Sequence, residues 1–150
     1  MNKTTKELEN TLLSVHKEDI SQVLDKEKEE ISNPIFTEYM KNIFKRNGLF
    51  QQDVFLRANI PERYGYKIIS GEKHTIQRDV ILSLCIGGKL TLQETDKALT
   101  LYNMAPLYAR NRRDAILIVA INKQVFDIDE VNKMLIENQE STLKEIGTIE

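Results

Sequence analysis

The sequence predicts an all-α protein with a core of five short helices and further helices on its amino- and carboxy-terminal sides. Apolar residues recur three and four positions apart through most of the chain, as they do on one face of a helix. Helix-capping residues and glycines separate these stretches, and no convincing pair of alternating strands interrupts them. The length of 150 residues suits a single domain with short extensions and excludes a multidomain enzyme.

The composition excludes several other classes of protein. The hydrophobic set makes up 41% of the residues and the charged set 29%, and there are only six Gly, three Pro and one Cys. Collagenous, mucin-like and disulfide-stapled folds are therefore excluded. The chain contains no apolar run long enough to span a membrane, and its first residues are polar, unlike a secretory signal. We expect a cytoplasmic protein without a membrane partner.

Residues 1–33 are predicted to form an acidic helical extension. Thr4 and Glu7 have the spacing of a capping box, and the following leucines are spaced as in short amphipathic helices. The acidic run over residues 25–30 is a solvated helix face or a linker, and Ser32, Asn33 and Pro34 end it. We place a domain boundary there, before a core over residues 34–103.

The first three core helices follow from the local stop and start residues. A helix from Pro34 has one apolar stripe and ends at Asn47-Gly48, where glycine permits a left-handed turn. Residues 51–58 form the next helix, which is interrupted at Asn59-Ile60-Pro61. A short helix then runs from Pro61, a favoured first helical residue, to Ile69.

The last two core helices have predicted caps of their own. Thr75 can cap a longer apolar helix, which ends at Gly87-Gly88 and contains Ile76, Val80, Ile81, Leu84 and Cys85. Thr91 to Glu94 is a capping box that opens the fifth helix, which is broken before Pro106.

Residues 104–140 are predicted to form a helical pair packed on the core. Asn111 caps a nearly continuous apolar helix over residues 115–121, and Asp127 caps a second one. The pattern is lost in residues 141–150, which we expect to be a frayed tail. The apolar stretch over residues 102–108 is expected to pack the two blocks together. The alternative is the surface of a homodimer.

Charge is distributed unevenly along the chain. Residues 1–40 carry five Lys and nine acidic residues, and residues 117–150 carry three Lys and seven acidic residues. Residues 41–116 carry thirteen Lys or Arg against seven acidic residues, a net charge of +6. A basic segment of this kind favours phosphate binding, because neutralising phosphates releases condensed counterions. The alternative is an ordinary solvated surface of mixed charge.

Two short helices joined by a tight turn match the helix-turn-helix plan, in which the second helix enters the major groove of DNA. The run over residues 51–71 resembles the helix-turn-helix of lambda-repressor and Cro-like regulators, the xenobiotic-response-element family. The resemblance covers residues 35–102 without a gap in the motif and implies a five-helix lambda-repressor-like core. The matching positions are Gln51, Ala58, Ile60, Ile68 and Gly71.

Two positions depart from that family, and a second resemblance covers more of the chain. Phe55 stands where the family usually has Ala, and Gly65 lies within the recognition helix. We expect the Phe55 side chain to fill the space that a larger residue at 65 would take. Residues 44–138 also resemble a subgroup of small helix-turn-helix proteins of Gram-positive bacteria, which implies a bacterial protein of this class.

The resemblance implies a set of DNA-binding residues, and Tyr64 and Ile68 are expected to face inward. The groove-facing candidates are Pro61, Glu62, Arg63, Tyr66 and Lys67, with Gln51 placed for a phosphate contact. Arg63 suits a guanine edge, and Glu62 suits a cytosine amine. The alternative is that Arg63 and Lys67 are ordinary solvated helix residues.

A second basic cluster consists of Arg110, Arg112 and Arg113, which flank the start of a helix. Cations are unfavourable at that end of the helix dipole, so an anion should offset them. One candidate is a DNA phosphate bound at the helix start. The alternative is an internal ion pair with Asp114 or with an acidic residue from either flank.

The remaining reactive residues indicate no enzyme. Cys85 lies in an apolar helical stripe and is expected to be a buried small hydrophobe. His16 and His74 have no second ligand at metal-binding spacing, and the chain has no phosphate-binding loop of the nucleotide-binding folds. We therefore predict no catalytic residue, no metal site and no cofactor.

These observations lead to two functional hypotheses. The first is a sequence-specific protein that binds double-stranded DNA, a transcriptional regulator whose carboxy-terminal helices support the reader or form a homodimer. The second is a helix-turn-helix fold that binds a protein partner, as an antitoxin or a scaffold does, through the acidic amino-terminal segment or through residues 102–108. The acidic flanks and the sequence pI of about 5.8 favour the second hypothesis.

Overall fold

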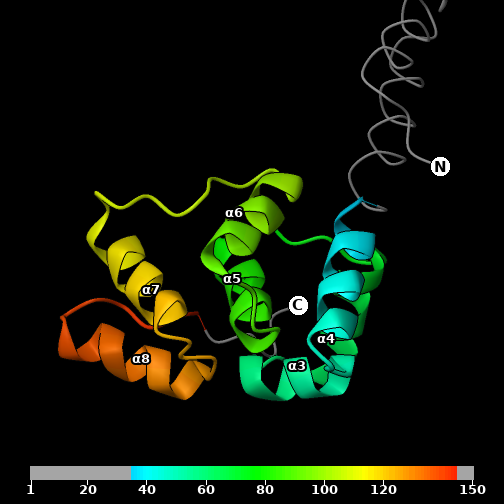
Figure 1. Cartoon of the computed structure of the whole chain (residues 1–150), viewed down its shortest axis with the longest axis horizontal. Coiled ribbons are helices and arrows are strands. Elements are labelled where there is room, and N and C mark those ends of the chain that lie inside the picture. The colour runs from blue at the N-terminus through cyan, green and yellow to red at the C-terminus, as the bar shows by residue number, and fades with distance from the viewer. Residues whose placement is uncertain (1–34, 145–150) are drawn as a thin grey trace, which may run out of the picture.

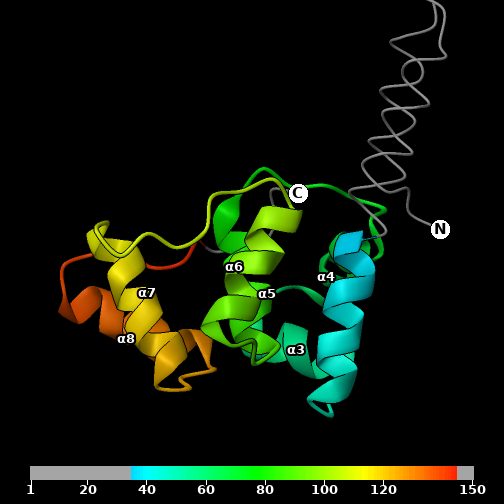
Figure 2. The same cartoon turned by 45° about the horizontal axis from the view of Figure 1, so that its top comes forward.

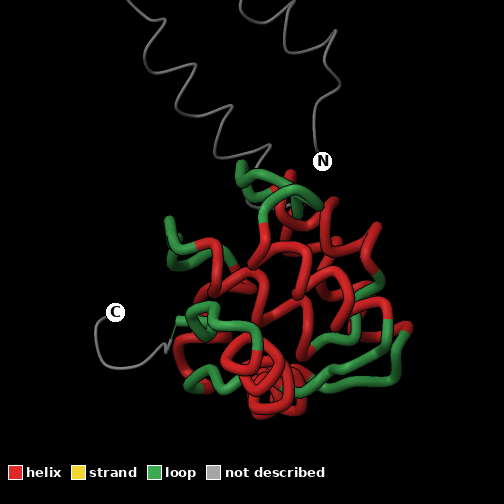
Figure 3. Tube along the Cα trace, turned by 90° about the vertical axis from the view of Figure 1, so that its left-hand side faces the viewer, coloured by secondary structure: helices red, strands yellow, loops and turns green. Residues whose placement is uncertain are grey.

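The computed structural model describes residues 35–144, and within this range every regular element is a helix (Figure 3). The prediction of an all-α protein is confirmed for this part of the chain. The first described helix covers residues 35–46. It is followed by α3 (Gln51–Ala58), α4 (Glu62–Ser70), α5 (Arg78–Gly87), α6 (Leu92–Leu101), α7 (Arg112–Asn122) and α8 (Ile128–Glu137). None of the described helices is long and apolar enough to cross a membrane.

Helix α5 lies at the centre of the described structure, with the helix of residues 35–46 and α4 on one side and α7 and α8 on the other (Figures 1 and 2). Every residue from Val80 to Gly87 is buried. The α5 sequence is apolar around most of its circumference, which is typical of a helix surrounded by others. Helices α3, α6 and α8 pack directly on α5, whereas α4 packs mainly on α3, and α7 mainly on α6 and α8.

Helix α3 lies against the end of α5, where Gly87 lets the two backbones approach closely. A Cβ atom at Gly87 would lie 2.5 Å from the carbonyl oxygen of Val54, so no larger residue fits without a shift. The guanidinium of Arg57 donates to the Gly87 carbonyl from Nε at 3.0 Å and from Nη2 at 2.8 Å. This contact holds α3, and with it the start of α4, on the core.

The side-chain caps predicted for the later helices are present. The Thr91 hydroxyl accepts a hydrogen bond from the backbone N–H of Glu94 at 3.2 Å, and Glu94 completes the capping box. The Asn111 side chain accepts from the N–H of Asp114 at 2.9 Å. Asp127 caps α8 in the same way. Each cap satisfies a backbone donor that the helix leaves free.

The predicted start of the fourth core helix was wrong. Thr75 does not cap it, because α5 begins at Arg78. The buried Thr75 N–H donates to the hydroxyl of Tyr102 at 3.1 Å, and the Thr75 hydroxyl accepts from the N–H of Gln77 at 3.1 Å. These bonds hold a turn in place of a helical start. Ile76, expected to belong to this helix, lies before it and is 91% exposed.

The stretch over residues 102–108 packs against the core at two points. Tyr102 lies between the ring of Phe36, 4.7 Å away, and the ring of His74, 4.6 Å away. Leu107 is also buried, and its N–H donates to Asp96 at 2.9 Å. Tyr108 at the end of the stretch is exposed.

The prediction of a frayed tail was wrong for residues 141–144. Leu143 is buried, and its N–H donates to the Asn132 side chain at 2.9 Å. The N–H of Lys144 donates to the Asp79 carboxylate at 2.8 Å, beside the guanidinium of Arg113. Residues 141–144 are therefore held by α5, α7 and α8. Residues 145–150 and the predicted acidic extension over residues 1–33 lie outside the described residues.

Candidate nucleic-acid interface

Helices α3 and α4 are joined by a tight turn over residues 59–61 that fixes their relative position. Asn59 adopts a left-handed backbone conformation with φ of 53°, which asparagine tolerates well. Ile60 follows, buried in the core, and its N–H donates to the Phe55 carbonyl at 3.0 Å. Pro61 then precedes α4 and restricts the backbone there. The turn therefore anchors the start of α4 to the core.

Helix α4 has one buried face and one exposed polar face. The buried residues of α4 are Tyr64, Gly65, Ile68 and Ile69. The predicted groove-facing residues Pro61, Glu62, Arg63 and Tyr66 are exposed, and Lys67 is half-buried. Tyr64 and Ile68 face inward as expected. The helical period thus separates the two sets of side chains, and the polar set lies on the outside of the molecule.

The unusual pair of Phe55 and Gly65 fits together as predicted. A Cβ atom at Gly65 would lie 2.5 Å from the Phe55 ring, and Phe55 is 1% exposed. The ring therefore occupies the space that a side chain at 65 would need. The Tyr66 and Phe55 rings also pack in a T-shaped arrangement, with ring centroids 5.0 Å apart and an interplanar angle of 83°. Phe55 thereby contacts α4 from the core and holds Tyr66 on its exposed face in place.

The polar side chains of α4 differ in whether they bind other residues of the protein. The amide of Gln52 on α3 donates to Oε1 of Glu62 at 2.9 Å, which ties one carboxylate oxygen to the neighbouring helix. Arg63 and Lys67 form no ion pair with any of the residues 35–144. Their cationic groups are therefore available to a ligand.

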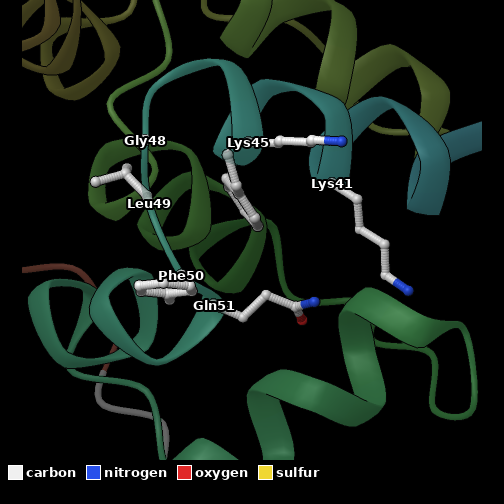
Figure 4. Close-up of a pocket in the computed structure, with 7 residues that line it drawn as sticks. Lys41, Lys45, Gly48, Leu49, Phe50 and Gln51 are labelled. Carbon is white, nitrogen blue, oxygen red and sulfur yellow. The ribbon is translucent and has the colours of Figure 1, made fainter.

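Gln51, the predicted phosphate contact, lies beside two lysines that the sequence analysis did not select. Gln51, Lys41 and Lys45 line an open pocket of about 450 Å³ together with Phe44, Gly48, Leu49 and Phe50. In Figure 4 the Lys41, Lys45 and Gln51 side chains extend to the same side of this pocket. The signal in the sequence was the four-residue spacing of the lysines, which places both on one helix face.

The electrostatics at this pocket favour an anion. The pocket opens at the start of α3, where the first backbone N–H groups of a helix have no partner within the helix. The helix dipole adds a partial positive charge there. Asp53 offsets part of it, since its carboxylate accepts from the Phe50 N–H at 3.1 Å. Lys41 and Lys45 form no ion pair within residues 35–144.

The second basic cluster is largely used inside the protein. Arg113 binds both carboxylate oxygens of Asp79, at 2.9 and 3.0 Å, so the internal ion pair weighed above is present with a different partner. Arg112 donates to the carbonyl of Asn138 at 3.0 Å and forms an ion pair with Glu140 at 3.9 Å, an acidic residue of the carboxy-terminal flank, as the alternative predicted. Arg110 is exposed. Of the three, Arg110 has the freest guanidinium for a phosphate.

Groups that could perform covalent or metal chemistry do not gather on this surface. Cys85 is fully buried in α5, and that burial raises the pKa of its thiol well above the usual range. Within residues 35–144 no three His, Cys, Asp or Glu side chains lie close enough together to hold a metal ion. The exposed polar residues of α4 are thus the main chemical feature of this face.

The chain was compared with protein-family models, with curated proteins and with solved structures. None of the three comparisons found a match. A functional assignment therefore rests on the residues of this chain and on their geometry.

Proposed function

We propose that the protein binds double-stranded DNA in a sequence-specific way and acts as a transcriptional regulator. In this proposal α3 and α4 form the helix-turn-helix, and α4 is the recognition helix that enters the major groove. The main supporting observation is that α4 has one buried face and one polar face, and that the polar face carries Glu62, Arg63, Tyr66 and Lys67. We also infer that the chain is related to lambda-repressor and Cro-like regulators, because its helices follow in the order that this resemblance implies.

Each exposed α4 side chain has a suitable partner on a base edge. Arg63 can donate two hydrogen bonds to guanine, and the free carboxylate oxygen of Glu62 can accept one from the amine of cytosine. Tyr66 can contact a thymine methyl group, and Lys67 can bind guanine or phosphate. Pro61, exposed immediately before α4, would lie beside the groove.

The pocket beside α3 supplies the contacts that would fix the register of the protein on DNA. A phosphate there would meet Lys41, Lys45, the Gln51 side chain and the free N–H groups of α3. Phosphate contacts position a protein on DNA without reading its sequence. We refer to Lys41, Lys45, Gln51, Arg63 and Lys67 together as the reader face.

The test is the binding of the full chain to random-sequence duplex DNA at two salt concentrations. We expect binding that weakens steeply with salt and is lost in Arg63→Ala/Lys67→Ala. The matched control is Lys123→Ala/Lys133→Ala, which removes the same charge from exposed lysines away from the reader face. DNA binding that is equal in the two double variants would show that the reader lies elsewhere. No binding even at low salt would contradict the proposed function.

A second candidate function is the binding of a protein partner through the carboxy-terminal helices. Its supporting observation is a hollow of about 390 Å³ between α7 and α8, whose apolar lining residues are Ala115, Ile116, Val119 and Met134. Val119, which lines this hollow, is 43% exposed. Apolar side chains exposed together often mark an interaction site. This function gains support if the DNA assay finds no binding.

A further inference from the structure

The reader face brings together cations from two segments that are separate in the sequence. The Thr37 hydroxyl donates to the Ile69 carbonyl at 2.6 Å, so the helix of residues 35–46 lies against the end of α4. Figures 1 and 2 show these two helices side by side. Lys41 and Lys45 are thus carried by a helix that neighbours α4, the helix that carries Arg63 and Lys67.

The other basic residues of the core are more often neutralised. Arg46 binds Glu94, and this ion pair lowers the pKa of the Glu94 carboxyl. Arg78 binds Asp114, and Arg113 binds Asp79. Lys41, Lys45, Arg63 and Lys67 form no such ion pair within residues 35–144, so the reader face keeps four uncompensated positive charges that would attract an acidic ligand.

The chain carries such an acidic ligand directly before this surface. Residues 1–34 contain eight acidic residues and five lysines, and four of the acidic residues fall within residues 25–30. The same six residues include Lys26 and Lys28, so residues 25–30 carry a net charge of -2 and residues 1–34 a net charge of -3. The net negative charge of residues 1–34 is thus complementary to the positive charge of the reader face.

The connection is short enough for an intramolecular contact. Glu30 precedes residue 35 by five positions, which an extended chain spans over about 17 Å. Lys41 lies six residues beyond residue 35, or about 9 Å along the helix, and Lys45 lies about 15 Å along it. Ser32, Asn33 and Pro34 between them are turn-forming residues that allow a reversal of direction.

We propose that residues 1–34 dock on the reader face of the same chain and exclude DNA from it. The acidic run over residues 25–30 would contact Lys41 and Lys45 first, with Arg63 and Lys67 within reach of the residues before it. The competition with DNA rests on the proposed function, whereas the docking itself does not. Individual surface ion pairs are weak, so this contact should be reversible and sensitive to salt.

The first experiment measures DNA affinity in the full chain without deleting any residue. The variant Glu27→Gln/Glu29→Gln/Glu30→Gln removes three negative charges from the docking segment. Because a short tether gives an effective concentration in the millimolar range, even weak docking should reduce DNA affinity, and we expect the variant to bind DNA about fivefold more tightly at low salt. The ratio between variant and parent should approach one as salt is raised.

The matched control is Glu130→Gln/Glu137→Gln/Glu140→Gln, which changes the net charge equally at α8 and just beyond it, on the far side of the molecule from α4 (Figure 1). A general effect of net charge would increase the DNA affinity of both variants by the same factor. That result would overturn the docking proposal. A gain confined to the first variant supports it.

The second experiment detects docking without DNA. Amide chemical shifts of the isotope-labelled full chain are compared between the parent and the Glu27→Gln/Glu29→Gln/Glu30→Gln variant, at low and at high salt. We expect low-salt differences at Lys41, Lys45, Arg63 and Lys67, and none in α7 or α8. Unchanged shifts at these four residues would overturn the proposal, whatever the DNA result.

The two experiments separate the two proposals. Shift differences on the reader face in a protein that binds no DNA would support docking and contradict the proposed function. DNA binding with unchanged shifts and equal affinities would support the function and contradict docking.

Discussion

Phe55 and Gly65 show how two unusual residues can be compatible only as a pair. Alanine normally stabilises a helix relative to glycine by about 0.5–1 kcal/mol. At position 65 a methyl group would instead lie 2.5 Å from the Phe55 ring, which is closer than carbon atoms approach without a shift. The steric cost of overpacking should exceed the gain in helix propensity, because it is typically about 1–3 kcal/mol.

We therefore expect the effect of Gly65→Ala to change sign with the residue at position 55. In the parent protein it should lower the free energy of unfolding by about 1–2 kcal/mol. In a Phe55→Ala background the space is open, and Gly65→Ala should raise the free energy of unfolding by about 0.5 kcal/mol. Urea denaturation of the four proteins measures this, with Phe55→Leu as the background if Phe55→Ala does not fold. An equal effect in both backgrounds would show that the two residues are not coupled.

The helix of residues 35–46 and α4 have different tasks in the proposed complex with DNA. Lys41 and Lys45 lie one helical turn apart beside the start of α3, where a phosphate fits but no base edge is read. Arg63 on α4 is the side chain best suited to distinguish guanine from the other bases. One helix should thus contribute affinity and the other specificity.

The variant Lys41→Ala/Lys45→Ala should weaken DNA binding by a similar factor for all sequences. Because two phosphate contacts are lost, the slope of log affinity against log salt should become shallower by about 1.8. Arg63→Ala should instead reduce the preference among sequences selected from a random pool. Both are measured by fluorescence anisotropy over a salt series, with Lys123→Ala/Lys133→Ala as the control. A change in sequence preference in the lysine variant would contradict this division of tasks.

The described helices are joined across the molecule by buried or half-buried ion pairs. Arg78 at the start of α5 binds both oxygens of Asp114 on α7, at 2.8 and 2.9 Å, and donates to the carbonyls of Ala105 and Pro106. The N–H of Tyr108 also donates to Asp114. Burial raises the pKa of the Asp114 carboxyl, but the hydrogen bonds from Arg78 and Tyr108 outweigh it and hold that pKa below its usual range.

This lowered pKa makes stability depend on pH in a defined direction. A carboxyl whose pKa is lower in the folded state stabilises that state above its unfolded pKa, and the stabilisation is lost as the pH falls through the folded pKa. Asp114→Asn should lower the free energy of unfolding by about 2 kcal/mol at pH 7, since it leaves Arg78 without its charged partner. The difference in the free energy of unfolding between this variant and the parent should shrink below about pH 4, because Asp114 of the parent then becomes protonated. Thermal unfolding from pH 7 to pH 3 measures it, with Glu137→Gln as an exposed control. A difference that is constant over this range would contradict the role of the ion pair.

Local sequence features predicted most of the helices and their caps. Thr91, Asn111 and Asp127 cap helices as expected, because a capping side chain acts on a backbone N–H only two or three residues away. The outward set on α4 was also predictable, because helical periodicity assigns each residue to a face. These features depend on neighbours in the sequence, and the sequence contains all of them.

The contacts between distant residues were not predictable in this way. Thr75 is held in a turn by Tyr102, and Arg113 pairs with Asp79 in place of Asp114. Lys41 and Lys45 join Gln51 at one pocket because the helix of residues 35–46 packs beside the start of α3. Periodicity and capping establish which segments are helical and which faces are buried. The choice of partner depends on how the helices pack in three dimensions, because ion pairs and pockets form between side chains that the chain order leaves far apart.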